Sequence, residues 1–143
     1  MKVIICGPRI LEDDEDYEML CDAIEKSGFE ISEVISGKAK CIDTLGERWA
    51  FENNVTVRGF PAKWKELKQA GAVIKENQYG KYNANAGFFR NMLMAEYGEA
   101  LIAIVNGSYG TANMVKQMKD LGKEVFTYNP EDYMTPEQIG YKF

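Results

Sequence analysis

The amino-acid sequence predicts a doubly wound α/β fold, in which a mainly parallel sheet of five or more strands carries helices on both faces. Short apolar runs of strand length alternate along the chain with longer segments whose apolar residues recur at helical spacing. The run Ala100–Val105 is apolar throughout, which is typical of a strand buried on both faces of a parallel sheet. Strands that alternate with helices favour parallel pairing with right-handed crossovers.

The first elements are predicted from the N-terminal pattern. The first strand, Val3–Cys6, is β-branched and apolar. The acidic run at residues 12–16 has a structural explanation, because Asp13 or Asp14 is a suitable helix N-cap and acids in a first turn complement the helix dipole. That helix ends at Gly28. We therefore favour a capped helix over a functional cluster of acids.

The remaining elements are predicted in the same way. Residues 62–80 lack firm periodicity, so we interpret this long stretch as a flap over the site or a contact between copies of the chain. A helix that carries Phe88 and Phe89 follows and ends at Gly98. The other predicted elements are strands at Glu30–Ile35, Val55–Phe60, Ala100–Val105 and Glu124–Tyr128, and helices at Asp43–Asn53 and Thr111–Leu121.

The 143 residues are enough for one domain with a substantial core. We expect this domain to span residues 1–128, and residues 129–143 to form a C-terminal tail that packs on the domain or on a neighbour. The hydrophobic fraction of 45% and the charged fraction of 27% are typical of a soluble globular protein. The chain begins with a strand rather than a signal peptide, and no apolar run reaches membrane-spanning length, so we expect a cytoplasmic location.

The charge balance limits the classes of partner. At a net charge of −5, we expect neither general nucleic-acid binding nor membrane attraction, because both need surplus Lys and Arg. The absence of histidine removes the side chain most used for acid–base catalysis near neutral pH and the commonest metal ligand. The three cysteines lack the spacing of a metal site or a disulfide framework. We expect reduced thiols, no metal and no cofactor.

The turn at Asn106–Thr111 has the features of an anion-binding loop. It contains Gly107 and Gly110 and leads from a strand directly into a helix, which leaves backbone N–H groups at the positive end of the helix dipole. Ser108 and Thr111 add hydroxyl donors. The turn is not a P-loop, because no Lys follows the last glycine. From the turn alone, an ordinary β-to-α connection is an equal alternative.

Positively charged residues follow other strands at the same edge of the predicted sheet. Arg9 follows the first strand, Lys38 and Lys40 follow the second, and Arg90 lies near the start of a helix. Ligands of doubly wound sheets bind beyond the carboxyl ends of the strands, so these cations favour phosphate, a nucleotide or a sugar phosphate as the ligand. Two solvated loop lysines are the alternative for the second loop. Asp43 is either a helix N-cap or a ligand contact.

Six motifs occur in the order found in YspA-like proteins. They are Gly7-Pro-Arg9, Ser36-Gly-Lys-Ala-Lys-Cys-Ile-Asp43, Glu47-Arg-Trp-Ala50, Phe60-Pro-Ala-Lys-Trp64, Ala86-Gly-Phe-Phe-Arg-Asn-Met92 and Gly107-Ser-Tyr-Gly-Thr-Ala-Asn-Met114. Over about residues 1–128 the chain thus resembles the YspA-like family of the SLOG superfamily, which consists of Rossmann-like nucleotide-binding domains. The resemblance implies a Rossmann-like fold that binds a nucleotide or a nucleotide-derived molecule at the Gly37 and Gly107 loops.

The related LOG phosphoribohydrolases cut the N-glycosidic bond of nucleoside monophosphates with an Arg and a Glu. Arg90 matches the Arg, whereas Asn113 stands at the position of the Glu. A neutral amide supplies neither a carboxylate for a ribosyl cation-like transition state nor a base for water. Lys38 and Cys41 also replace glycines of the YspA-like pattern, so we expect the ligand to be held differently or to be more anionic.

Two functions follow from the resemblance and the residues. The first is a sensor or sequestering module for a nucleoside phosphate, an ADP-ribose-like molecule or a cyclic nucleotide. The second is a nucleoside-phosphate or nucleotide-sugar N-glycohydrolase, with Arg90 catalytic and with Asp43 or Glu47 as the acid. A single-stranded DNA binder is a weak third option, because the net charge is negative. A homodimer or higher homo-oligomer is expected from the family, with the helix around Phe88–Phe89 as a possible contact.

The predicted ligand contacts come from every loop at this edge of the sheet. They are Gly7, Arg9, Gly37, Lys38, Ala39, Lys40, Asp43, Arg90, Asn91, Gly107, Ser108, Gly110, Thr111 and Asn113.

Overall fold

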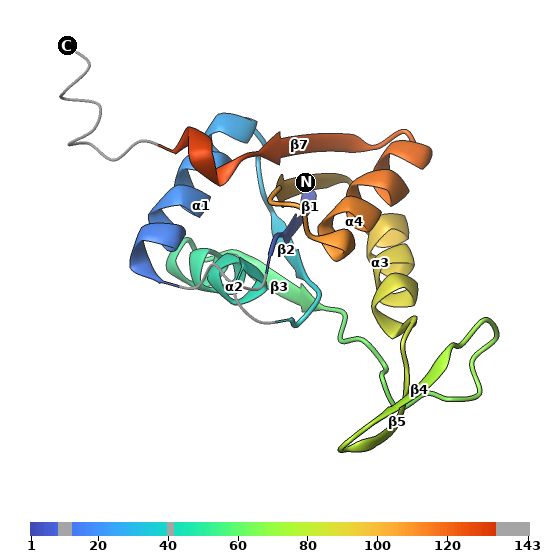
Figure 1. Ribbon diagram of the computed structural model, residues 1–143. Helices are drawn as coiled ribbons and strands as arrows, with labels where there is room; N and C mark the ends of the chain where they lie inside the picture. The colour runs from blue at the N-terminus through green and yellow to red at the C-terminus, as the bar shows by residue number, and fades with distance from the viewer. Residues whose placement is uncertain (9–12, 40–41, 134–143) are drawn as a thin grey trace, which may run out of the picture.

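The computed structural model describes residues 1–8, 13–39 and 42–133, and its main feature is a sheet of five parallel strands (Figure 1). The strand order is β3-β2-β1-β6-β7. The strands are β1 (Lys2–Cys6), β2 (Glu33–Ser36), β3 (Thr56–Gly59), β6 (Ala100–Ile104) and β7 (Glu124–Tyr128). The fold is therefore an α/β, Rossmann-like fold, as predicted.

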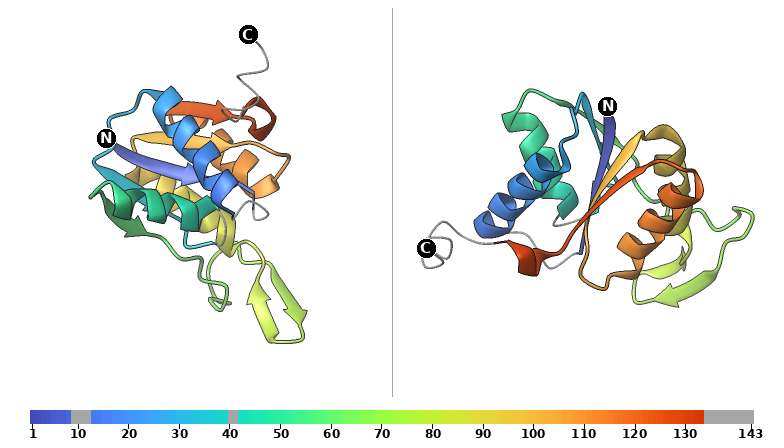
Figure 2. Two further views of the ribbon diagram at one scale, coloured as in Figure 1. Left: turned by 90° about the vertical axis from the view of Figure 1, so that its left-hand side faces the viewer. Right: turned by 90° about the horizontal axis from the view of Figure 1, so that it is seen from above.

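Four helices cover the two faces of this sheet. The helices α1 (Asp14–Ser27) and α2 (Ile42–Glu52) lie on one face, and α3 (Ala86–Tyr97) and α4 (Tyr109–Asp120) lie on the other (Figure 2). A short 3₁₀ helix, η1 (Pro130–Asp132), follows β7. The doubly wound arrangement is thus confirmed.

Two apolar cores lie between the sheet and its helices. Alternate residues of the central strand β1 point into different cores, with Val3 and Ile5 toward α1 and α2 and Ile4 toward α3 and α4. Every residue of β6 is buried, as expected for a central strand covered on both faces. These cores hold the ends of β1 and β6 in fixed positions.

The direction of chain winding reverses between β1 and β6. From β1 the chain builds outward through β2 to β3, and it then returns to place β6 on the other side of β1 and continues to β7. The connections from the carboxyl ends of β1 and β6 therefore leave toward opposite faces and open a crevice between them. This is the edge to which the sequence assigned the ligand.

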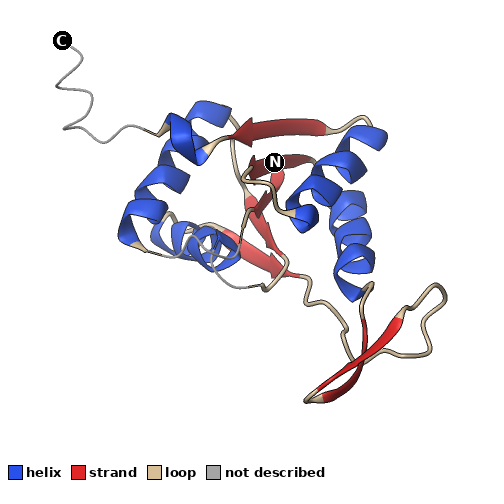
Figure 3. Cartoon of the chain, in the orientation of Figure 1, coloured by secondary structure: helices blue, strands red, loops and turns tan. Residues whose placement is uncertain are grey.

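Residues 62–80 contain structure that the sequence analysis did not predict. The strands β4 (Ile74–Asn77) and β5 (Gly80–Asn83) form an antiparallel hairpin that extends away from the main sheet (Figure 3). All residues of β4 are exposed, so this strand has no buried face that would have produced an alternating apolar pattern. The roles of this stretch as a flap over the site or a contact between copies stay predictions.

Some element boundaries also differ from those predicted. The second strand begins at Glu33 rather than Glu30, because Phe29 and Ile31 pack against the core from the preceding loop instead of from a strand. The last helix begins at Tyr109 rather than Thr111, so both Gly110 and Thr111 lie in its first turn. This shift moves the helix N-terminus closer to the strand end.

The C-terminal region is described only as far as Tyr133, which packs against the core beside α1 and α2. The division into a domain at residues 1–128 and a tail stays a prediction, because residues 134–143 lie outside the described part of the chain. Among the helices of the described residues, none is both long enough and apolar enough to cross a membrane.

Candidate functional site

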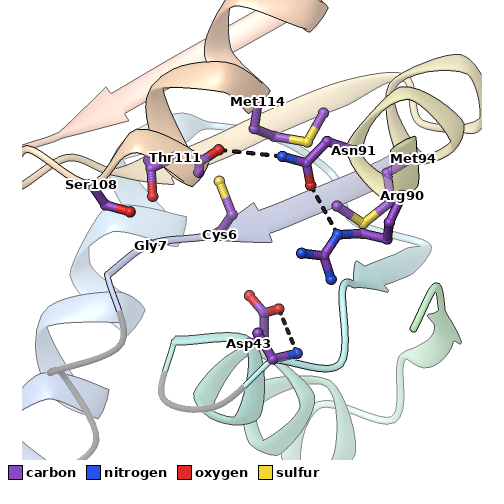
Figure 4. Close-up of a pocket in the computed structure, with 11 residues that line it drawn as sticks. Cys6, Gly7, Asp43, Arg90, Asn91, Met94, Ser108, Thr111 and Met114 are labelled. Atoms are coloured by element: carbon purple, nitrogen blue, oxygen red, sulfur yellow. Dashed lines mark hydrogen bonds between the residues drawn. The ribbon is translucent and has the colours of Figure 1, made fainter. Parts of the chain in front are cut away.

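A small cavity lies at the crevice where the carboxyl ends of β1 and β6 diverge (Figure 4). Its volume is about 80 Å³. Residues that follow β1, β2 and β6 contribute to its wall, together with residues of α3. The lining residues are Cys6, Gly7, Ala39, Asp43, Arg90, Asn91, Met94, Ser108, Gly110, Thr111 and Met114. The structure therefore brings together eight of the predicted ligand contacts at one place.

Arg90 is a cation at this cavity, and Asn91 and Gly37 are among the partners that hold its guanidinium group. Its Nε donates a hydrogen bond to Asn91 Oδ1 at 2.9 Å, and its Nη1 donates to the backbone carbonyl of Gly37. The second bond joins α3 to the loop after β2. The guanidinium is thus fixed in the crevice rather than free to move in solvent.

Arg90 approaches the backbone of Gly37 closely, so a larger residue there would displace the guanidinium. A Cβ atom at this position would lie 2.7 Å from Arg90 Nη1 and 3.0 Å from Asp43 Oδ2, and a carbon atom does not approach polar atoms that closely. Gly37 therefore allows the arginine to bond to its backbone carbonyl. It lines the neighbouring larger cavity as well.

Asn91 and Asn113 form a second layer behind Arg90. Asn91 is buried, and its Nδ2 donates to Asn113 Oδ1 at 3.0 Å and to the Gly110 carbonyl at 3.3 Å. These bonds orient the Asn91 amide so that its oxygen faces Arg90. Asn113 therefore supports Asn91.

Asp43 supplies a carboxylate on the wall formed by α2. It is 8% exposed, and its Oδ2 accepts a hydrogen bond from the Ala39 backbone N–H at 3.1 Å. Of the two roles considered for Asp43, the helix N-cap was wrong, because α2 already begins at Ile42. Asp43 instead closes the loop after β2 while facing the cavity (Figure 4).

Lys38 lies beside the small cavity rather than in it. Its ammonium group forms an ion pair with Glu47 of α2, and the carbon chain of Lys38 covers Gly59. The backbone of Lys38 has a φ of +57°, a conformation that glycine adopts more readily, and the YspA-like pattern has a glycine at this position. The positive charge of Lys38 is therefore partly neutralised by Glu47.

The start of α4 forms the wall opposite Asp43. Gly107 has a φ of +74°, which turns the chain from β6 toward the helix. In the described structure, the Ser108 side chain makes no capping bond to the helix, although Ser108 is the N-cap residue. Its side chain lines the cavity instead, together with the buried Thr111. Two hydroxyl groups and the first-turn N–H groups of α4 therefore lie at this wall.

Three cavity residues were not among the predicted contacts. Cys6 is the last residue of β1, so its place at the end of a central strand was the available signal. Burial, and then the nearby Asp43 carboxylate, raise the pKa of the Cys6 thiol, while Arg90 acts in the opposite direction. Met94 and Met114 form the apolar floor, one helical turn after Arg90 and Thr111 respectively.

The other predicted contacts lie elsewhere. Arg9 and Lys40 fall outside the described residues, so their roles stay predictions. Gly107 and Asn113 support the wall and do not line the small cavity in the described structure. Among the described residues, no group of three or more His, Cys, Asp or Glu side chains is arranged to hold a metal ion.

Arg90 also borders larger cavities outside the crevice. One of about 410 Å³ lies toward the loops after β2 and β3. Another of about 180 Å³ lies toward Gly87, Phe88 and the start of α4. A third of about 310 Å³ lies toward β3 and Phe89. The Arg90 side chain is thus the point where the small cavity meets space large enough for an organic ligand.

Comparison with known proteins agrees with this architecture. Residues 1–66 match the model of the YAcAr family, described as the YspA, cpYpsA-related SLOG family. This match confirms the predicted resemblance over residues 1–66. A comparison with curated proteins finds no significant match.

A solved structure shows the same fold. DNA processing protein A (DprA) from Streptococcus pneumoniae is similar over 88% of this chain and 49% of that chain, with a TM-score of 0.62 and 17% sequence identity. This chain thus spans about half the length of DprA. At this level of identity, the likeness shows a shared Rossmann-like fold.

Proposed function

From the match of residues 1–66 to this SLOG family, we propose that the chain binds a nucleotide or nucleotide-derived small molecule, as a sensor or sequestering module. The candidate ligands are a nucleoside phosphate, an ADP-ribose-like molecule and a cyclic nucleotide. The observation that carries the proposal is Arg90, whose guanidinium is fixed by Asn91 and Gly37 beside the uncapped start of α4. This arrangement suits an anionic group.

In the proposed complex, a phosphate lies between Arg90 and the start of α4. The planar guanidinium offers paired donors to phosphate oxygens, and the helix N-terminus adds N–H groups and a favourable dipole. The small cavity of about 80 Å³ is large enough for one phosphate-sized group but not for a nucleotide. The rest of the ligand would therefore extend past Arg90 into the larger adjoining cavities.

The support for binding rather than catalysis comes from Asn113. This residue is neutral, and its oxygen already accepts a hydrogen bond from Asn91. It therefore lacks the carboxylate that the LOG enzymes use at this position. The sequence also has no histidine to replace it.

Isothermal titration calorimetry with AMP, ADP-ribose and 3′,5′-cyclic AMP tests the proposal. We expect at least one of these ligands to bind, and Arg90→Ala to weaken its affinity about 100-fold. Arg90→Lys keeps the charge but loses the paired donors, so we expect an intermediate loss. Arg48→Ala is the matched control, because Arg48 pairs with Asp14 of α1, away from the cavity. Equal losses for Arg48→Ala and Arg90→Ala, or no binding by the wild type, would contradict the proposal.

An N-glycohydrolase is the second candidate, and it is favoured by the position of Asp43. Of the two acids proposed from the sequence, Asp43 lines the cavity, whereas Glu47 forms an ion pair with Lys38. A carboxylate opposite Arg90 could stabilise a ribosyl cation or activate water. Incubation with nucleoside monophosphates and chromatography for the free base test this candidate. Turnover lost in Asp43→Asn but kept in Glu47→Gln would favour it, and no free base from the wild type would exclude it for these substrates.

A homo-oligomer stays a prediction. Phe88, Met92 and Leu93 of α3 are between 41% and 54% exposed, so this helix offers apolar side chains to a partner copy. Analytical ultracentrifugation of the wild type and Leu93→Lys tests this role, since a charged residue at a contact would shift the protein toward monomers.

A further inference from the structure

Trp64 is an exposed aromatic residue beside the candidate site. Trp64 lines both the cavity of about 410 Å³ and the cavity of about 180 Å³ that border Arg90. It is 39% exposed, whereas the other tryptophan of the chain, Trp49, packs against the core. Trp64 thus presents a large apolar ring to solvent at the place where a ligand would extend from Arg90.

The backbone fixes Trp64 in this place. The Trp64 carbonyl accepts a hydrogen bond from the Asn83 backbone N–H at 2.6 Å, which ties the loop to the end of β5. Asn83 is fully buried, and its Oδ1 accepts hydrogen bonds from the N–H groups of Val73 at 3.3 Å and Asn85 at 3.0 Å. The Asn85 side chain also bonds to this segment, because its Nδ2 donates to the Gly71 carbonyl at 3.1 Å.

The larger cavity is of suitable size and composition for a planar ring. Its wall combines the Trp64 indole and small apolar residues with two cationic side chains. The lining residues are Gly37, Lys38, Ala39, Pro61, Ala62, Trp64 and Arg90. Ala39 and Arg90 also line the small cavity, so the two spaces adjoin at these residues. A ligand with its phosphate beside α4 would place its next group here.

We propose that Trp64 is the stacking platform for the base of the bound nucleotide, an inference that rests on the proposed function. The indole ring offers a large π-face, and stacking on a base is favourable for any of the common bases. The backbone bonds from Asn83 hold the Trp64 segment in place before the ligand arrives, which reduces the entropy lost on binding. Trp64 would thus make the site prefer nucleotides over simple sugar phosphates.

A comparison of two ligands distinguishes the contribution of the base to binding from that of the phosphate. The tightest binder among AMP, ADP-ribose and 3′,5′-cyclic AMP is compared with ribose 5-phosphate, which lacks the base. We expect Trp64→Leu to weaken binding of the nucleotide about tenfold or more and to leave ribose 5-phosphate affinity unchanged. Trp64→Phe keeps an aromatic face and should restore most of the nucleotide affinity. Thermal unfolding of each variant checks that the fold is kept.

Fluorescence gives a direct readout of contact with the ring. In Trp49→Phe, Trp64 is the remaining tryptophan of the chain, and we expect its emission to be quenched by the nucleotide but not by ribose 5-phosphate. If both ligands bind but Trp64→Leu affects them equally or not at all, the platform is excluded while the proposed function stands. If no member of the panel binds the wild type, the proposed function fails, and the platform fails with it.

Discussion

The helices α1 and α4 begin beyond neighbouring parallel strands, on opposite faces of the sheet, and their N-termini are built differently. At α1, Asp13 Oδ1 accepts a hydrogen bond from the Asp16 N–H at 2.8 Å, and Asp16 Oδ2 accepts one from the Asp13 N–H at 3.2 Å. Its first turn is acidic throughout. At α4, the Ser108 side chain forms no capping bond within the described structure, and the described first turn holds no acid.

The N-terminus of α1 is complemented by negative charge from the helix's own residues. The acids of α1 supply negative charge and acceptors at its N-terminus, so an external anion there would meet repulsion. The start of α4 instead has hydroxyl groups, a fixed arginine beside it and a cavity in front of it. The negative charge that complements α4 is therefore expected from a ligand.

The largest effect is expected from giving α4 the kind of cap that α1 has. In Ser108→Asp, the new carboxylate would accept the first-turn N–H groups and stabilise the helix by roughly 0.5 kcal/mol. The same charge would repel a bound phosphate, so we expect affinity to fall about 10- to 100-fold. Calorimetric titration and thermal unfolding measure the two effects. A variant that is more stable and still binds fully would show that the ligand does not lie at this helix.

The second test removes the close approach between Gly37 and Arg90. A Cβ atom in Gly37→Ala would displace the guanidinium, so we expect nucleotide binding to weaken about tenfold. Because the effect acts through Arg90, it should be absent in an Arg90→Ala background. A full additional loss in the double variant would mean that Gly37 contacts the ligand itself.

The third test breaks the cap of α1. Asp13→Ala removes both the acceptor for Asp16 and a favourable charge, so we expect the free energy of unfolding to fall by about 1 kcal/mol. The melting temperature should fall by about 2–4 °C for a domain of this size. Ligand affinity should not change. Weaker binding in this variant would contradict the division of roles between the two helices.

The smallest expected effect is on the reactivity of the Cys6 thiol. Cys6 is the last residue of β1, and its side chain lies on the face of the sheet that α3 and α4 cover. Burial and then Asp43 raise its thiol pKa, so iodoacetamide should modify Cys6 more slowly in the folded protein than in the unfolded one at pH 8–9. Asp43→Asn removes a negative charge and should increase the rate a few-fold, as measured by mass spectrometry of the Cys6 peptide. An unchanged rate in Asp43→Asn would contradict the proximity of the Asp43 carboxylate to the Cys6 thiol.

The direction of the pH effect on stability follows from the same raised pKa. The neutral Cys6 thiol is favoured in the folded state, so its contribution to stability is present below the ordinary thiol pKa of about 8.5. As pH rises above that value, the unfolded chain loses the proton first and the contribution declines. Cys6→Ala should make the fall in stability between pH 8 and pH 10 less steep.

The fold was predictable because most of its elements carry a buried pattern. The strands β1 and β6 consist largely of continuous apolar residues. The ends of α1 were recognisable because Asp13 is a typical N-cap residue and Gly28 a typical C-terminal residue. The hairpin β4–β5 carries no such pattern, because its strands pack against each other and leave most residues exposed. Its stability depends on buried Asn83, a polar residue that gives no periodic signal.

The candidate site was predictable only in outline. Loops that follow parallel strands meet at one edge of the sheet, so Arg90, Asp43 and Ser108 could be placed together. The partner of each side chain depends on tertiary geometry. Glu47 neutralises Lys38 from the next helix, and Asn113 bonds to Asn91 rather than facing the cavity. Charge counts along the chain do not reveal such pairings.

The attachment of the hairpin to the domain has a practical consequence for protein engineering. The two ends of the segment 64–83, which contains the hairpin, lie close together where the Trp64 carbonyl meets the Asn83 N–H, and the hairpin tip points away from the sheet (Figure 1). Tyr79 at that tip is 78% exposed. Surface loops of this kind accept added sequence readily. An affinity tag or a fluorescent reporter could therefore be inserted at the tip while the sheet and the Arg90 cavity keep their structure.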